Sequence, residues 1–156
     1  MQLRKENKLL LNFVKTHVDA VAPSYAHEGD AGMDLSSVED VIILPGGRAL
    51  ISTGISIQIR PGYVGLVHPR SGLANNHGVT VLNAPGTVDS GYRGEIKVNL
   101  INLGSKVFRV AKGDRIAQIV FHEFTYAIPN EVLNLEDSVR GTGGLGSTGG
   151  INASRI

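Results

Sequence analysis

The chain has 156 residues, 42% of them hydrophobic, which suffices for one domain with a single buried core and is too short for two. Fifteen Lys and Arg residues stand against fourteen Asp and Glu, so no global charge attracts nucleic acid or an anionic membrane surface. The chain contains no cysteine. Disulfides, a thiolate nucleophile and sulfur-based zinc sites are therefore excluded, and we expect no direct nucleic-acid binding.

The N-terminal region shows no targeting pattern. After a polar start, the apolar run at residues 9–11 is far shorter than the hydrophobic region of a signal peptide or a membrane span. The sequence therefore predicts a cytoplasmic protein that does not bind membranes.

Short apolar segments separated by turns follow along most of the chain, which contains twenty glycines and six prolines. Apolar residues alternate with polar ones at 55–60 and again at 96–100, which predicts strands with one buried face. Further strands are predicted at 41–44, 64–68, 79–83, 108–110 and 116–121, and short helices at 71–76 and 130–139. This pattern predicts an all-β fold of the sandwich, jelly-roll or barrel type.

From residue 140 the composition changes to a glycine-rich segment that cannot bury enough apolar surface to order itself. We therefore predict a β domain over residues 1–139 and a flexible C-terminal arm over residues 140–156. The arm is either a disordered tail or a segment that folds over an anionic ligand with its free backbone N–H groups. Composition alone favours the tail.

The sequence supports neither a dinucleotide-binding site nor a histidine metal site. The run GTGGLG at 141–146 formally matches a dinucleotide fingerprint, but no strand leads into it and no helix follows. The five histidines show no spacing of three or four residues, so the sequence gives a histidine metal site little support.

Four other segments concentrate polar residues among turns, and each alone fits an ordinary surface turn. They are AGMDL at 31–35, PRSGLA at 69–74, GTVDSGYRG at 86–94 and GDRIAQ at 113–118. Arg70, Ser71 and Gly72 offer a cation, a hydroxyl and an unhindered amide, which suits a phosphate. Asp89 near Tyr92 is either turn chemistry or a base held beside a sugar.

Together with the glycine-rich ending, these segments resemble the five signature motifs of the trimeric dUTP pyrophosphatase (dUTPase) family, in the same order and at similar intervals. The resemblance spans Ala31 to Gly149. It implies a jelly-roll-like β fold, a homotrimer with three active sites at subunit boundaries, and Mg²⁺ bound to a nucleoside triphosphate. The activity implied is hydrolysis of dUTP to dUMP and pyrophosphate.

The resemblance also implies roles for residues around the nucleoside. Asp89 would orient and deprotonate the water that attacks the α-phosphorus and would contact the sugar 3′-hydroxyl. Tyr92 would lie under the deoxyribose and leave no room for a 2′-hydroxyl. Asn83 would read the uracil edge, with Thr87 and Val88 among the substrate-binding residues.

Other roles implied by the resemblance concern the phosphates. The α and β phosphates would be held by Arg70, Ser71, Gly72 and Gln118, and Lys97 would also contact the substrate. Asp34 would support Mg²⁺ through water, since this ion keeps several of its waters.

In the arm, the resemblance implies that Arg140, Ser147 and Thr148 close over the γ-phosphate, so that the arm acts as a lid. Leu145 and Gly146 would also contact the substrate. Leu145 stands where the family usually carries an aromatic ring that covers the uracil, so weaker stacking is expected here.

Two alternatives remain open from the sequence. A dCTP deaminase has a similar fold and attacks the base instead of the phosphate, but the Asp89 and Tyr92 motif and the glycine-rich arm argue against it. A regulatory protein that uses the nucleotide only as a switch is disfavoured by the retained polar positions, although an added regulatory partner is compatible with them. Release of pyrophosphate from dUTP, or of ammonia from dCTP, distinguishes the two chemistries.

Overall fold

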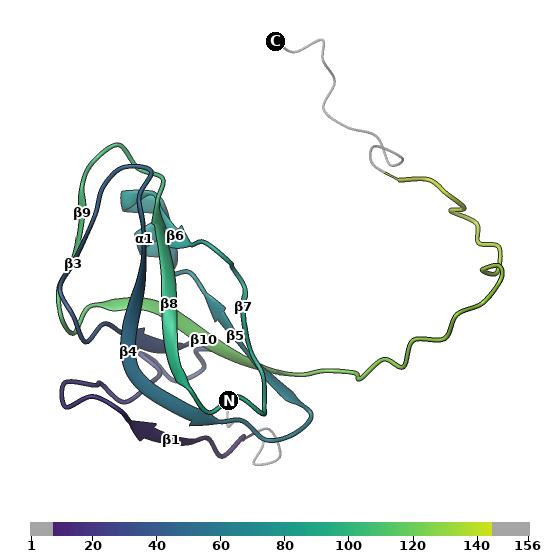
Figure 1. The fold of residues 1–156 in the computed structure, drawn as a ribbon, viewed down its shortest axis with the longest axis horizontal. Helices are drawn as coiled ribbons and strands as arrows, with labels where there is room; N and C mark the ends of the chain where they lie inside the picture. The colour runs from purple at the N-terminus through teal and green to yellow at the C-terminus, as the bar shows by residue number, and fades with distance from the viewer. Residues whose placement is uncertain (1–7, 145–156) are drawn as a thin grey trace, which may run out of the picture. The chain divides into compact units, whose positions relative to one another are not determined.

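The computed structural model describes residues 8–144, which divide into two compact units after Tyr126 (Figure 1). The predicted all-β, jelly-roll-like fold is confirmed, because the described residues form ten strands and one short helix, all in the first unit. The elements are β1 (Asn12–Lys15), β2 (Met33–Ser36), β3 (Val41–Ile43), β4 (Arg48–Gln58), β5 (Tyr63–His68), α1 (Ser71–His77), β6 (Val79–Val81), β7 (Gly86–Val88), β8 (Glu95–Asn102), β9 (Phe108–Val110) and β10 (Arg115–Glu123).

Two four-stranded sheets and one two-stranded ribbon make up the first unit. The sheets have the orders β1-β4-β8-β6 and β2-β10-β5-β7, and the ribbon is β3-β9. All pairings are antiparallel. Since strands adjacent in a sheet are mostly distant in the chain, the chain passes repeatedly from one sheet to the other, as in double-sheet jelly rolls.

One apolar core joins the two sheets. Ile51 and Val98 come from the first sheet, and Leu35, Val67 and Ile119 come from the second, all at most 4% exposed. Burial of aliphatic side chains of this size is the main force that holds such sheets together. Candidate active-site side chains that point away from this core therefore lie on strands whose positions the core fixes.

Strand β8 shows the predicted alternation. Ile96, Val98 and Leu100 are buried, whereas Glu95 and Lys97 lie on the opposite face. Because successive side chains of a strand point to opposite faces, this face of β8 presents a row of polar groups.

The helix predictions had different outcomes. The helix predicted at 71–76 is present as α1, which ends at Gly78 in the left-handed conformation with φ 68°. The helix predicted at 130–139 is wrong, since residues 127–144 form neither helix nor strand. Leu133 and Val139 are fully exposed, and an isolated helix of this length is marginal without an apolar face to bury.

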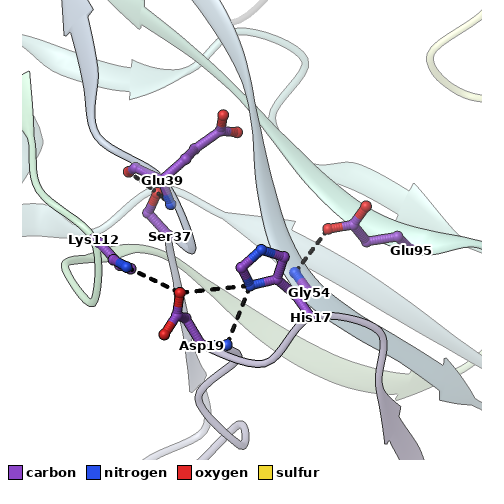
Figure 2. A network of polar contacts seen from close by, with 7 residues as sticks. All are labelled: His17, Asp19, Ser37, Glu39, Gly54, Glu95 and Lys112. Atoms are coloured by element: carbon purple, nitrogen blue, oxygen red, sulfur yellow. Dashed lines mark hydrogen bonds and ion pairs between the residues drawn. The ribbon is translucent and has the colours of Figure 1, made fainter.

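The segment after β1 is tied to the turn before β10 by polar contacts (Figure 2). The Lys112 ammonium lies 2.9 Å from the Asp19 carboxylate, and His17 Nδ1 lies 3.9 Å from the same carboxylate. The hydrogen bond lowers the pKa of Asp19 and raises the pKa of Lys112. Since both side chains are largely exposed, this pair orients the segment more than it stabilises the fold.

The described part of the second unit, residues 127–144, is held locally by a turn. The Gly141 amide donates to the Ser138 carbonyl at 2.9 Å, and Arg140 Nε donates to the Gly143 carbonyl at 2.9 Å. The domain boundary predicted after residue 139 falls inside this unit, and the flexibility of the arm stays a prediction. Within residues 8–144, no helix has the length and hydrophobicity needed to span a bilayer.

Candidate active site

Arg70, which directly precedes α1, and Ser71 and Gly72, the first residues of α1, lie on the wall of a cavity of about 960 Å³. Asp34 from β2 and Gln118 from β10 line the same cavity. All five residues were predicted from three separate motifs, and the β2-β10-β5 pairing brings them together. The cavity therefore joins cationic, hydroxyl and amide groups of the kind that hold phosphates.

Asp34 anchors two arginines at this cavity. Its carboxylate lies 3.0 Å from Arg70 Nε and 3.0 Å from Arg115 Nη1, and its side chain is 13% exposed. Arg70 Nη1 also donates to the carbonyl of Arg115 at 3.1 Å. Since a guanidinium is planar, two fixed partners set its orientation before any ligand arrives.

Gln118 is fixed by its neighbours on two sides. Its Nε2 donates to the Pro69 carbonyl at 3.0 Å. A Cβ at Gly32 would lie 2.8 Å from the Gln118 Cδ, so only glycine permits this close approach. Gly32, the glycine of the AGMDL segment, thereby leaves space for the Gln118 side chain.

A second cavity, of about 560 Å³, gathers the residues predicted to bind the nucleoside. They are Asn83, Thr87, Val88, Asp89 and Tyr92, and they are joined by Lys97, which was predicted to contact the substrate without a specified part of it. Strand β7 pairs with β5 and delivers Asp89 at its end, and β8 carries Lys97. A Cβ at Gly86 would lie 3.2 Å from Asn83 Nδ2, so the small residue lets the amide side chain lie against β7.

The Tyr92 ring is folded back over its own hairpin. The Tyr92 amide donates to the Asp89 carbonyl at 3.1 Å, and the Tyr92 hydroxyl donates to the Glu95 carbonyl at 3.0 Å. A Cβ at Gly94 would lie 2.6 Å from Tyr92 Cζ. The absence of a side chain at Gly94 therefore leaves room for the Tyr92 ring.

The two cavities share no lining residue. Within residues 8–144 of one chain, the predicted phosphate contacts and the predicted nucleoside contacts thus line different cavities, although Val67 and His68, which are neighbours on β5, line one each.

The residues at the larger cavity suit a hydrated magnesium ion that arrives with a phosphate ligand. Among the described residues, no group of three or more His, Cys, Asp or Glu side chains could hold a metal ion by themselves. Magnesium in such sites takes few protein ligands and keeps waters. Although both carboxylate oxygens of Asp34 already accept from arginines, each has a further lone pair for a water.

The predicted arm contacts fall mostly outside the described residues. Leu145, Gly146, Ser147 and Thr148 lie there, so their predicted contacts stay predictions. Arg140 is described, and it bonds within its own turn.

Sequence reasoning missed two residues that organise these cavities. Arg115 was treated as part of a turn, although it shares the Asp34 carboxylate with Arg70. Glu95 lines the nucleoside cavity and was not considered. Its signal was available, because Glu95 and Lys97 are two positions apart on one strand and must share a face.

Comparisons with known proteins agree on one family. The family model described as dUTPase matches residues 19–149. The deoxyuridine 5'-triphosphate nucleotidohydrolase of Clostridium kluyveri is 57% identical over 131 residues, which cover 84% of this chain and 92% of that protein. The protein of the same name from Wolinella succinogenes is 53% identical over 142 residues, which cover 91% and 95%.

A solved structure is similar over nearly the same span. The dUTPase of Staphylococcus bacteriophage 80alpha with dUPNHPP has a TM-score of 0.84 and 28% sequence identity to this chain. The match covers 91% of this chain and 99% of the phage protein.

Proposed function

Because the chain belongs to the dUTPase family, we propose that it hydrolyses dUTP to dUMP and pyrophosphate by attack of water on the α-phosphorus. The observation that carries the proposal is the cavity in which Asn83, Asp89, Tyr92 and Lys97 meet. An amide, a carboxylate, an aromatic ring and a cation surround a space that suits a nucleoside. Removal of dUTP limits uracil incorporation into DNA and supplies dUMP for dTMP synthesis.

Selection of the nucleoside follows from two side chains in this cavity. The Tyr92 ring forms a floor under the sugar that leaves no room for a 2′-hydroxyl. The Asn83 amide reads the uracil edge, with the backbone of Thr87 and Val88 nearby. A fixed set of donors and acceptors rejects the wrong base strongly, because a mismatch leaves buried polar groups unpaired.

Asp89 acts as the general base. Its carboxylate accepts a proton from the attacking water and holds that water toward the α-phosphorus. No covalent nucleophile is needed, since phosphoryl-transfer catalysis consists mainly of positioning and charge stabilisation.

The phosphates are bound by Arg70, Ser71, Gly72 and Gln118, with Arg70 oriented by Asp34. Asp34 would hold Mg²⁺ through water, and the ion would supply neutralisation of phosphate charge. Lys97 adds a cation on the nucleoside side. These contacts hold the scissile bond in line with the water that Asp89 orients.

We further propose a homotrimer in which each active site combines residues of different subunits. The assignment of the nucleoside contacts and the phosphate contacts to different cavities of one chain is compatible with this assembly. Exposed apolar side chains of the second unit, among them Ile128, Leu133 and Leu135, offer surface that a neighbouring subunit would bury. The arm from Arg140 onward then closes over the γ-phosphate of another subunit's site. The cytoplasmic location stays a prediction from the sequence.

Substrate preference tests the proposed function directly. In a pyrophosphate-release assay with Mg²⁺, we expect dUTP to be hydrolysed with strong preference over UTP, dTTP and dCTP. The Tyr92 floor excludes the 2′-hydroxyl, and the Asn83 hairpin excludes a 5-methyl group and an exocyclic amine. Comparable turnover of UTP would contradict the proposal, and ammonia released from dCTP would replace it with a deaminase.

A second test concerns the Asp34 carboxylate that orients Arg70. We expect Asp34→Asn to raise KM for dUTP by on the order of tenfold at saturating Mg²⁺, since a charge-assisted bond to the guanidinium is lost. Asp30→Asn is the matched control, because Asp30 lines the same cavity but accepts a hydrogen bond from the His27 amide. An unchanged KM for Asp34→Asn would show that Arg70 needs no such support.

A further inference from the structure

Glu95, which lines the nucleoside cavity, bonds to an irregularity in the neighbouring strand β4. Glu95 Oε1 accepts a hydrogen bond from the Gly54 amide at 2.7 Å (Figure 2). Glu95 Oε2 lies 3.9 Å from Lys97 Nζ. The register of β4 against β8 shifts between Ser52 and Ser56, so Gly54 lies at an irregularity of the ladder. The Glu95 carboxylate therefore supplies the partner that this amide would otherwise lack.

The point at which the Glu95 carboxylate is anchored is itself held firmly. The Gly54 carbonyl accepts from the Thr16 amide at 2.8 Å, and Gly54 has a φ of 65°. A Cβ at residue 54 would lie 2.8 Å from the Cβ atoms of His17 and Ala20, which cover it. Gly54 thus has little freedom to move away from Glu95.

The backbone next to Glu95 is anchored to the same stretch of β4. The buried Thr53 hydroxyl donates to the Ile96 carbonyl at 2.6 Å. Two neighbouring residues of β4 therefore bind two neighbouring residues of β8. The Thr53 side chain binds the Ile96 backbone, and the Gly54 backbone binds the Glu95 side chain. The start of β8 is fixed relative to the core.

Glu95 also holds the Tyr92 ring, through its backbone. The Tyr92 hydroxyl donates to the Glu95 carbonyl at 3.0 Å, so the far end of the ring is fixed to residue 95. The near end is fixed by the Tyr92 amide, which donates to Asp89. The carbonyl that holds the ring and the carboxylate that binds Gly54 belong to one residue, so the Gly54 bond adds a side-chain anchor to the backbone anchors of residue 95.

We propose that Glu95 is a positioning residue. It holds the Tyr92 ring in the position at which 2′-deoxyribose fits against the ring and the 2′-hydroxyl of ribose does not. This inference rests on the proposed function, in which the Tyr92 ring excludes a 2′-hydroxyl by contact. Steric exclusion of a 2′-hydroxyl requires that the Tyr92 ring does not move away from the sugar. An apolar surface that can move rejects an extra hydroxyl only weakly. The anchorage of Glu95 to β4 gives the floor this stiffness.

The test measures kcat/KM for dUTP and for UTP in Glu95→Ala. We expect the dUTP to UTP ratio to fall on the order of tenfold, mainly through better use of UTP, because residue 95 loses its side-chain bond to Gly54 and then holds the Tyr92 hydroxyl less firmly. Glu95→Gln keeps an acceptor for Gly54 and should retain most of the ratio. Tyr92→Phe removes the other end of the link and should lower the ratio similarly, and the double variant should lose little more.

Glu39→Ala is the matched control. Glu39 Oε1 accepts from the Ser52 amide at 2.8 Å, so it supports the same strand by the same kind of bond, but it does not line the nucleoside cavity. We expect it to keep the wild-type ratio.

The outcomes separate this inference from the function on which it rests. A wild-type protein that uses UTP as well as dUTP overturns the proposed function. A selective wild type with an unchanged ratio in Glu95→Ala, or equal losses on both nucleotides, overturns only the positioning role. If Glu95→Ala does not fold, Tyr92→Phe decides alone, since an unchanged ratio there is incompatible with a floor held by this hydrogen bond.

Discussion

Asp89→Asn is expected to lower kcat for dUTP by a factor on the order of 10² or more, the loss typical of a positioned general base. Asn has nearly the same shape as Asp but does not accept the proton of the attacking water. Asp89 lies at the end of β7 on the wall of the nucleoside cavity, and the Tyr92 amide donates to its backbone, not to its side chain. We therefore expect the hairpin, the oligomer and nucleotide binding to be largely unchanged.

Steady-state kinetics, together with titration of a non-hydrolysable dUTP analogue, checks this expectation. Asp40→Asn is a suitable control, because Asp40 accepts a hydrogen bond from the Lys112 amide and lines neither cavity. A near-normal rate for Asp89→Asn would show that another group is the base. Loss of analogue binding would show instead that Asp89 acts mainly on the ground state.

Deletion of residues 140–156 is expected to preserve the trimer and to reduce turnover of dUTP by at least about 10², because the γ-phosphate loses its closing contacts. Sedimentation measures the assembly, and pyrophosphate release measures turnover. Deletion of residues 150–156 is the matched control, since these residues follow the family match at 19–149. An active monomer would contradict both the assembly and the role of the arm.

Mixing two inactive variants tests whether the arm acts on another subunit. Trimers formed from Asp89→Asn chains and chains without residues 140–156 contain some sites with an intact Asp89 from one chain and an intact arm from another. We expect such mixtures, refolded together, to recover part of the wild-type activity. No recovery despite mixed trimers would indicate that each arm closes over the site of its own chain.

Local patterns in the sequence were enough to predict much of the fold. The alternation at 96–100 predicted β8 and its buried face, because the period of two is a property of each strand by itself. Glycine after residues 71–77 agrees with the left-handed end of α1. Strands β1, β2 and β7 were missed, and β2 and β7 lie inside segments that fit ordinary turns.

The candidate residues were also predicted from the sequence, through the resemblance of its five motifs to one family. The sequence did not predict which of these residues line the same cavity. Only the pairing of β2 with β10 and of β10 with β5 brings Asp34, Arg70 and Gln118 to one cavity, and only the pairing of β7 with β5 turns Asp89 toward another. Contacts such as Asp34 to Arg115 join residues 81 positions apart, beyond the reach of any local period.

Glu95 marks the limit most clearly. Its place on the polar face of β8 follows from alternation, so the sequence alone determined that it faces the same way as Lys97. Its partner, the Gly54 amide, is 41 positions away and is free to donate this bond because the ladder shifts between Ser52 and Ser56. At this irregularity His17 and Ala20 pack closely over Gly54, and packing between distant segments is decided by the tertiary structure.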